Sequence, residues 1–100
     1  MNREESVLAM IRAALQDAAA DLTGYRVVLF GSRARGQARA RSDFDIGVLG
    51  NTPLPLGTFF RLAERFEQMP TLYSVDWVDL HRTSPAFRQS AIEQAITLHE

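Results

Sequence analysis

Hydrophobic residues recur along the chain with two different spacings, and these spacings predict its helices and strands. At positions 2–22 they lie three or four residues apart, which is typical of an amphipathic helix, and Gly24 then ends it. Three shorter runs are rich in β-branched and aromatic residues and predict strands at 25–30, 44–49 and 72–80. In the 44–49 run the apolar residues Phe44, Ile46 and Val48 alternate with other residues, so this strand is expected to have one face in the core.

Helical spacing returns in the second half of the chain. The aromatic and aliphatic residues at 59–66 predict a helix that Pro70 stops, and a final helix begins at Ser84 and runs through Ala95. One or two helical turns are expected at 32–37. The resulting order, α-β-β-α-β-α, predicts an α/β or α+β domain in which helices pack on a small mixed sheet of about three strands.

Composition narrows the class of protein. One hundred residues, 46% of them hydrophobic, correspond to one domain with a modest core, too small for a second lobe around a cleft. The formal net charge is −1, which does not favour direct binding to nucleic acid. The chain has no cysteine, no apolar run long enough to span a membrane and an acidic N-terminus unlike a signal peptide, so we expect a cytoplasmic protein.

Two carboxylates open the second predicted strand. Asp43 and Asp45 share one face, while Phe44, Ile46 and Val48 point to the other and into the core. Two carboxylates so close repel each other, and a divalent cation such as Mg²⁺, which prefers oxygen ligands, would remove that repulsion. The alternative is that both acids only cap the entrance of the strand in solvent.

A Gly-Ser pair lies ten residues before this acidic pair. Gly31 follows a strand and Ser32 opens a short helix, where backbone N–H groups and a hydroxyl can receive phosphate oxygens. The Gly-Ser…Asp-x-Asp spacing resembles the motif of the polymerase-beta-like nucleotidyltransferase superfamily. That resemblance implies the superfamily's fold, a bound nucleoside triphosphate, and one or two Mg²⁺ ions.

The resemblance also implies a third carboxylate from a neighbouring strand. The segment VDWVDL offers Asp76 and Asp79, which lie three residues apart and hence on opposite faces, so only one can join the acidic pair. In the family pattern the matching acid is the first, Asp76, which would serve as a metal ligand and catalytic residue with Asp43 and Asp45. The reverse assignment to Asp79 stays open.

Two arginines follow the Gly-Ser pair, where a triphosphate would carry its charge. Arg33 or Arg35 could bind the β- or γ-phosphate, because guanidinium groups match phosphate geometry. Two residues apart on a helix, they point in different directions, so we expect one of them to reach the nucleotide. The alternative for both is a solvated helix face.

The segments FGSRARG, SDFDIGVL and VDWVDLHRTSPAFRQSAI resemble those of the minimal nucleotidyltransferases (MNT), and the resemblance covers nearly all of residues 1–100 as a single domain. It implies an antitoxin that transfers AMP from ATP to a tyrosine of a HEPN-domain toxin, a separate protein with which it could form a hetero-oligomer; a homo-oligomer is also open. One rival is a binding antitoxin that neutralises its partner by occlusion. Another is a transferase that acts on a small molecule or an RNA end.

Overall fold

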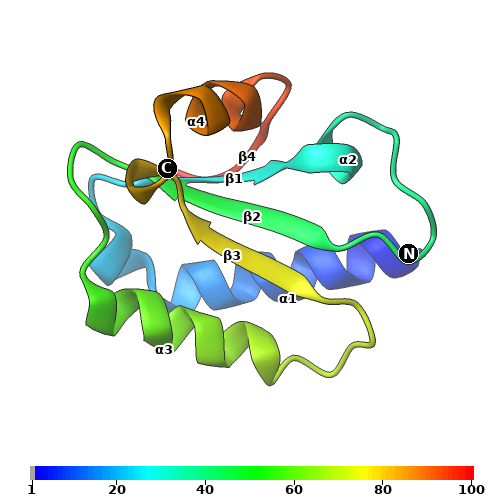
Figure 1. Ribbon diagram of the computed structural model, residues 1–100. Coiled ribbons are helices and arrows are strands. Elements are labelled where there is room, and N and C mark those ends of the chain that lie inside the picture. Colours follow the sequence, from blue (N-terminus) through cyan, green and yellow to red (C-terminus); the bar gives the residue numbers. More distant parts are fainter. Residues whose placement is uncertain (1) are drawn as a thin grey trace.

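A mixed sheet of four strands forms the centre of the molecule, which a computed structural model describes over residues 2–100. The strand order is β3-β2-β1-β4 (Figure 1). The central strand β1 pairs antiparallel with both β2 and β4, whereas β2 and β3 run parallel. The strands comprise β1 Arg26–Phe30, β2 Phe44–Leu49, β3 Val75–Asp79 and β4 Ile96–His99.

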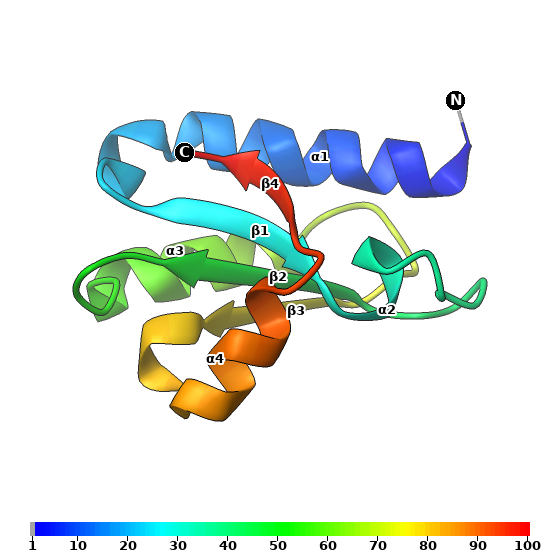
Figure 2. The same ribbon diagram turned by 90° about the horizontal axis from the view of Figure 1, so that it is seen from above.

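Helices cover the two faces of this sheet unequally. The long helices α1 (Arg3–Asp17) and α3 (Leu56–Glu67) lie on one face, and α4 (Pro85–Ile92) lies on the other (Figures 1 and 2). The short helix α2 (Gly31–Ala34) continues directly from β1. Two 3₁₀ turns complete the fold: η1 Ala19–Leu22 and η2 Leu80–Arg82.

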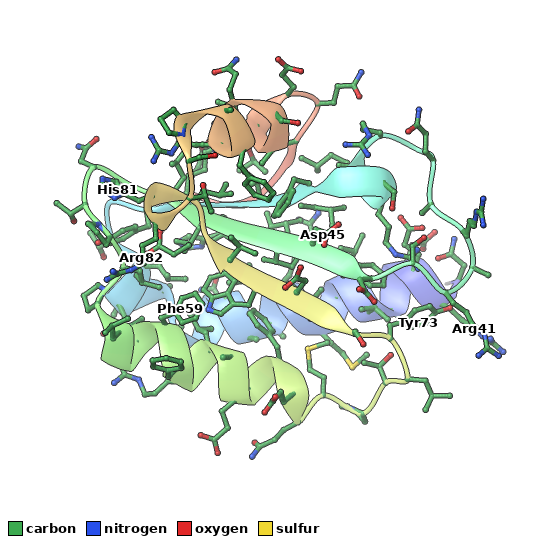
Figure 3. The ribbon with its side chains drawn as sticks, in the orientation of Figure 1. Arg41, Asp45, Phe59, Tyr73, His81 and Arg82 are labelled. Atoms are coloured by element: carbon green, nitrogen blue, oxygen red, sulfur yellow. The ribbon has the colours of Figure 1, made fainter. Side chains whose placement is uncertain are left out.

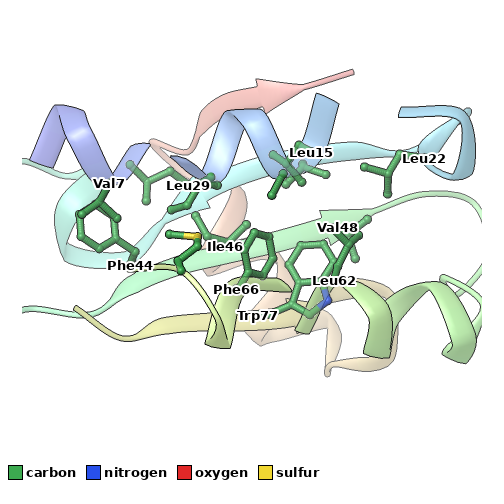
Figure 4. Close-up of a cluster of buried hydrophobic side chains, with 14 of the residues drawn as sticks. Val7, Leu15, Leu22, Leu29, Phe44, Ile46, Val48, Leu62, Phe66 and Trp77 are labelled. Carbon is green, nitrogen blue, oxygen red and sulfur yellow. The ribbon is translucent and has the colours of Figure 1, made fainter. Parts of the chain in front are cut away.

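The main core lies between the sheet and the pair α1 and α3 (Figure 4). As the alternation in β2 predicts, Phe44, Ile46 and Val48 are fully buried on this face. Trp77 of β3 belongs to the same cluster, and its indole N–H donates to the Phe59 carbonyl at 3.0 Å. Side chains on the opposite face of β2 therefore point away from the main core.

The opposite face has a smaller core beneath α4. Val28, Phe30, Leu80 and Ala91 form it, and the ring of Phe30 meets that of Phe87 edge to face at 6.1 Å. Because α4 lies toward one end of the sheet, away from α2, it leaves the rest of this face uncovered (Figure 1).

The C-terminal end differs from the prediction in two ways. The sheet has four strands where about three were expected, and the final helix is shorter than expected. The last helix stops at Ile92, and β4 adds to the free edge of β1. The break occurs at Gln94, whose φ of 60° turns the chain out of the helix. A left-handed backbone is uncommon for a non-glycine residue, so the glutamine gave no signal of the turn. Among residues 2–100, no helix is long and apolar enough to cross a bilayer.

Candidate active site

The uncovered part of the sheet carries two of the predicted acids. Asp45 of β2 and Asp76 of β3 are register partners on adjacent parallel strands, so their side chains leave the same face. Phe30 pairs with Asp45 across β1 and β2, which identifies this face as the one that α4 partly covers. Asp43 directly precedes β2 and is exposed. The expected adjacency of the two acidic strands is confirmed.

The Gly-Ser turn lies against Asp45 because β1 ends at its register partner, Phe30. Gly31 has a φ of 73°, a conformation that L side chains rarely adopt. A Cβ atom added to Gly31 would also overlap Oδ2 of Asp45. The glycine therefore meets two separate requirements, a left-handed turn and a close approach to the carboxylate. Figure 3 shows Asp45 on β2 beside α2.

Arg33 lies within α2 and Arg35 directly follows it, and the two side chains have different surroundings. Arg33 is buried, and its guanidinium donates to the Ser42 carbonyl at 2.7 and 3.0 Å and to Glu4 at 3.3 Å. This differs from the expected phosphate contact, because the return of the 37–43 loop over α2 encloses the side chain and occupies its donors. Arg35 is exposed, and its positive charge acts on Asp45.

The carboxylates influence one another electrostatically. Burial raises the pKa of Asp45 above its ordinary value, and the negative charges of Asp76 and then Asp43 raise this pKa further. The charge of Arg35 acts in the opposite direction and does not outweigh them. Ionised Asp45 is thus disfavoured where it stands, and a cation beside it would stabilise the charged form.

Asp79 is part of the scaffold in this structure. It is buried on the other side of β3, and it accepts hydrogen bonds from the backbone N–H groups of Leu54 at 2.8 Å and His81 at 3.0 Å. Its carboxylate also pairs with Arg82 at 3.4 Å. Asp79 therefore caps the start of η2 at the end of β3, on the side of the strand opposite to Asp76.

The donor atoms on the open face are of the kind that Mg²⁺ takes. Asp43, Asp45 and Asp76 supply only carboxylate oxygens, and a cation among them would offset the burial and the neighbouring negative charges that raise the pKa of Asp45. Within residues 2–100, no three acidic or histidine side chains already stand close enough together to enclose an ion. Side-chain rotation would therefore have to accompany binding, and Asp43 and Asp76 are exposed and free of packing that would prevent it.

A groove of about 680 Å³ reaches one of the three acids, Asp43, but not Asp45 or Asp76. It runs between the start of α1 and the 70–74 loop, and Asp43 is one of its lining residues. Arg3, Arg41 and Tyr73 also border it. Neither Arg3 nor Tyr73 was predicted to lie near the site, since no sequence pattern brings these distant segments together.

The structure thus brings the Gly-Ser turn next to paired carboxylates on adjacent strands, which is the arrangement that the nucleotidyltransferase motif in the sequence predicts. Residues 25–100 match the family described as "Polymerase beta, Nucleotidyltransferase". The chain belongs to the polymerase beta nucleotidyltransferase family and, within it, to the minimal nucleotidyltransferases that include MntA. The family assignment drawn from the sequence is confirmed.

Known proteins of this kind resemble the chain over most of its length. The "Probable protein adenylyltransferase MntA" of Haemophilus influenzae is 32% identical over 93% of this chain and 79% of its own. A solved toxin-antitoxin structure with AMP-PNP is 28% identical, with a TM-score of 0.68 over 91% of this chain and 71% of that one. The fold also matches, at 24% identity and a TM-score of 0.62, a complex of tri-AMPylated Shewanella oneidensis HEPN toxin with MNT antitoxin, over 94% and 70% of the two chains.

Proposed function

We propose that this chain transfers AMP from ATP to a tyrosine of a helical HEPN-domain toxin and thereby acts as its antitoxin. The observation that carries the proposal is the register pair Asp45 and Asp76 beside the Gly31 turn on an uncovered sheet face. The relative from H. influenzae is named a protein adenylyltransferase, and a related toxin-antitoxin structure contains AMP-PNP.

The nucleotide would bind across the turn between β1 and α2. Backbone N–H groups at Gly31 and Ser32, together with the Ser32 hydroxyl, would receive the terminal phosphates. The guanidinium of Arg35 is exposed and near enough for its charge to act on Asp45, and it would contact the β- or γ-phosphate. With its terminal phosphates held there, the triphosphate would have its α-phosphate near the acidic residues.

Asp43, Asp45 and Asp76 would hold Mg²⁺. When bound there, Mg²⁺ would neutralise the phosphate and carboxylate charges and favour loss of the proton from the acceptor hydroxyl. Asp45 and Asp76 belong to the adjacent strands β2 and β3 and Asp43 directly precedes β2, so the three carboxylates would orient the nucleotide through the cation that they share.

The transfer itself exchanges one bond for another. The tyrosine oxygen forms a bond to the α-phosphorus, the bond from that phosphorus to the bridging oxygen breaks, and pyrophosphate leaves. The phenolic proton passes to a carboxylate, for which Asp76 is suited because it is exposed on the edge strand β3. A partner protein can reach this edge without entering a closed cleft.

Labelling distinguishes this reaction from other phosphate transfers. The chain is mixed with a candidate HEPN-domain toxin, Mg²⁺, and ATP carrying radioactive phosphorus at either the α or the γ position. We expect label from the α position only, and none when Asp43 and Asp45 are both replaced by Asn. Label from the γ position would identify a kinase, and absence of label from both would contradict the proposed transfer.

A further inference from the structure

Arg33 holds the polypeptide on both sides of Asp43. Its Nε and Nη2 atoms donate to the Ser42 carbonyl at 3.0 and 2.7 Å, and Nη2 lies 3.4 Å from the Ala40 carbonyl. Its Cζ atom lies 4.1 Å from the centre of the Phe44 ring. Ser42 and Phe44 are the immediate neighbours of Asp43, so one buried guanidinium binds the backbone before this acid and contacts the side chain after it.

The same arginine connects elements that would otherwise be independent. Nη1 pairs with Glu4 of α1 at 3.3 Å, and the ring of Tyr73, from the loop before β3, lies 5.2 Å from Cζ. Arg33 itself belongs to α2, directly after the Gly-Ser turn. The planar fork of an arginine can serve two carbonyls and a ring at once, which a lysine cannot do.

After Asp43 the chain is held at Phe44, which is buried in the main core and donates its N–H to the Ser74 carbonyl at 2.9 Å, whereas the segment before Asp43 has fewer contacts. Asp43 is exposed and precedes the first paired residue of β2, so the sheet does not hold it as it holds Asp45. Apart from Arg33, the loop before it is closed by the paired contacts of Arg39 and Ser42, at 2.9 and 3.1 Å. Because a carboxylate must be held near its working geometry to bind a cation well, loss of the Arg33 contacts would loosen one of the three acids.

We infer that Arg33 is a positioning residue, which sets the place of Asp43 for cation binding and does not bind the nucleotide. The inference rests on the proposed function in one respect only, that Asp43 is a ligand of Mg²⁺. It assigns to the α2 segment two separate tasks: the Gly31-Ser32 turn faces the phosphates, and the next residue faces inward and orders the acidic loop.

The chain offers a matched control in Arg88 of α4. This arginine also donates to three backbone carbonyls, those of Leu80, His81 and Thr83, at 2.9, 3.0 and 3.2 Å. Its contacts lie around η2, away from the acids on the open face. Replacing either arginine by Met therefore removes a similar set of hydrogen bonds, but only one replacement affects the segment around Asp43.

The test measures the Mg²⁺ concentration that gives half of the ATP-dependent rise in melting temperature, for wild type, Arg33→Met, Arg33→Lys and Arg88→Met. We expect Arg33→Met to raise this concentration by about tenfold, as for other residues that support a metal ligand, and Arg33→Lys to raise it less. ATP affinity at saturating Mg²⁺ should stay near that of the wild type. Arg88→Met should lower the melting temperature without changing the Mg²⁺ requirement.

Hydrogen exchange gives a second readout that needs neither cation nor nucleotide. Amides at 38–43 should exchange faster in Arg33→Met than in Arg88→Met. Equal Mg²⁺ requirements in Arg33→Met and the wild type, or weakened ATP binding with unchanged exchange at 38–43, would overturn the inference. If the wild type itself shows no Mg²⁺-dependent effect of ATP, the proposed function fails, and exchange at 38–43 alone decides whether Arg33 orders the loop.

Discussion

At the scale of single residues, Asp45 has an environment that opposes its charge. Its raised pKa, caused by burial and by the neighbouring acids Asp76 and Asp43, means that the folded protein holds a proton more tightly than the unfolded chain does. Stability therefore falls as pH rises from the ordinary value of 3.8 through the raised pKa, and the unfavourable contribution persists at neutral pH. Such a conflict is typical of a site that functions with a bound cation.

Replacement of Asp45 by Asn should separate stability from function. In a solution free of divalent cations at neutral pH, Asp45→Asn should have a higher melting temperature than the wild type, because a neutral amide avoids the repulsion. The advantage should shrink as pH is lowered toward 3.8. The same variant should lose the stabilisation that Mg²⁺ and ATP give together. Melting curves across this pH range test both effects, and a variant that is less stable than wild type at neutral pH would contradict the electrostatic argument.

Gly31 allows a similarly controlled substitution. Gly31→Ala adds a Cβ atom that overlaps the Asp45 carboxylate, and it also places a side chain on a left-handed backbone. Gly36 has a similar φ of 70°, but no atom lies within 4 Å of the Cβ that Gly36→Ala would add. Gly36→Ala therefore adds the backbone strain alone. Both should lose about 1–2 kcal/mol of stability. Only Gly31→Ala should weaken binding of Mg²⁺ and ATP, by about tenfold or more, or at least 1.4 kcal/mol. Calorimetric titration tests this, and equal binding by both variants would show that the close approach to Asp45 is unimportant.

At the scale of elements, alternation along the strands was sufficient to predict the faces of the sheet. Because Phe44, Ile46 and Val48 had to be buried, Asp45 had to lie on the opposite face, and the structure agrees. Pairing between β2 and β3 then brought Asp76 beside it. Such predictions depend only on local periodicity and on which strands are neighbours.

Features that depend on a distant segment could not be predicted in this way. Burial of Arg33 requires the 37–43 loop to fold back over α2 and Glu4 to reach it from α1. Likewise β4 forms because β1 has a free edge for it, although its residues continue the helical spacing of α4 in the sequence. In both cases tertiary contacts, not local preference, decide the outcome.

Asp79 stabilises the contacts between β3, the turn η2 and the loop that contains Leu54. Its carboxylate joins the end of β3 to the turn η2 and to the loop at Leu54, so Asp79→Asn should destabilise the protein by about 1–3 kcal/mol. Transfer measured well below the melting temperature should stay close to that of the wild type, because Asp79 points away from the open face. Denaturant unfolding and the labelling assay check these two outcomes. Loss of transfer by a folded Asp79→Asn variant would instead make Asp79 the third catalytic acid.

At the scale of the whole molecule, the site is built on a surface and not within a cleft. α1 and α3 cover one face of the sheet completely enough to form the main core, whereas α4 covers only part of the other (Figure 1). Asp76 is thus accessible from the β3 edge, and Asp43 lines the groove beside α1. This openness suits an acceptor that belongs to a separate protein, since the partner can supply the missing wall of the site.

An antitoxin with such an open site could neutralise the toxin either by transferring AMP to it or by covering its active surface. The variant Asp76→Asn distinguishes these two mechanisms. Asp76→Asn replaces a carboxylate by an amide of the same size on an exposed edge, so it should stop AMP transfer while complex formation with the toxin stays within about twofold of the wild type. Cells that produce the toxin should then grow with wild-type antitoxin but not with Asp76→Asn, although the two proteins still co-purify. Asp79→Asn, produced at a temperature at which it is folded, is the control and should protect the cells. If Asp76→Asn protects as well as the wild type, the partner is neutralised by occlusion, and the acids on the open face are not required for the antitoxin effect.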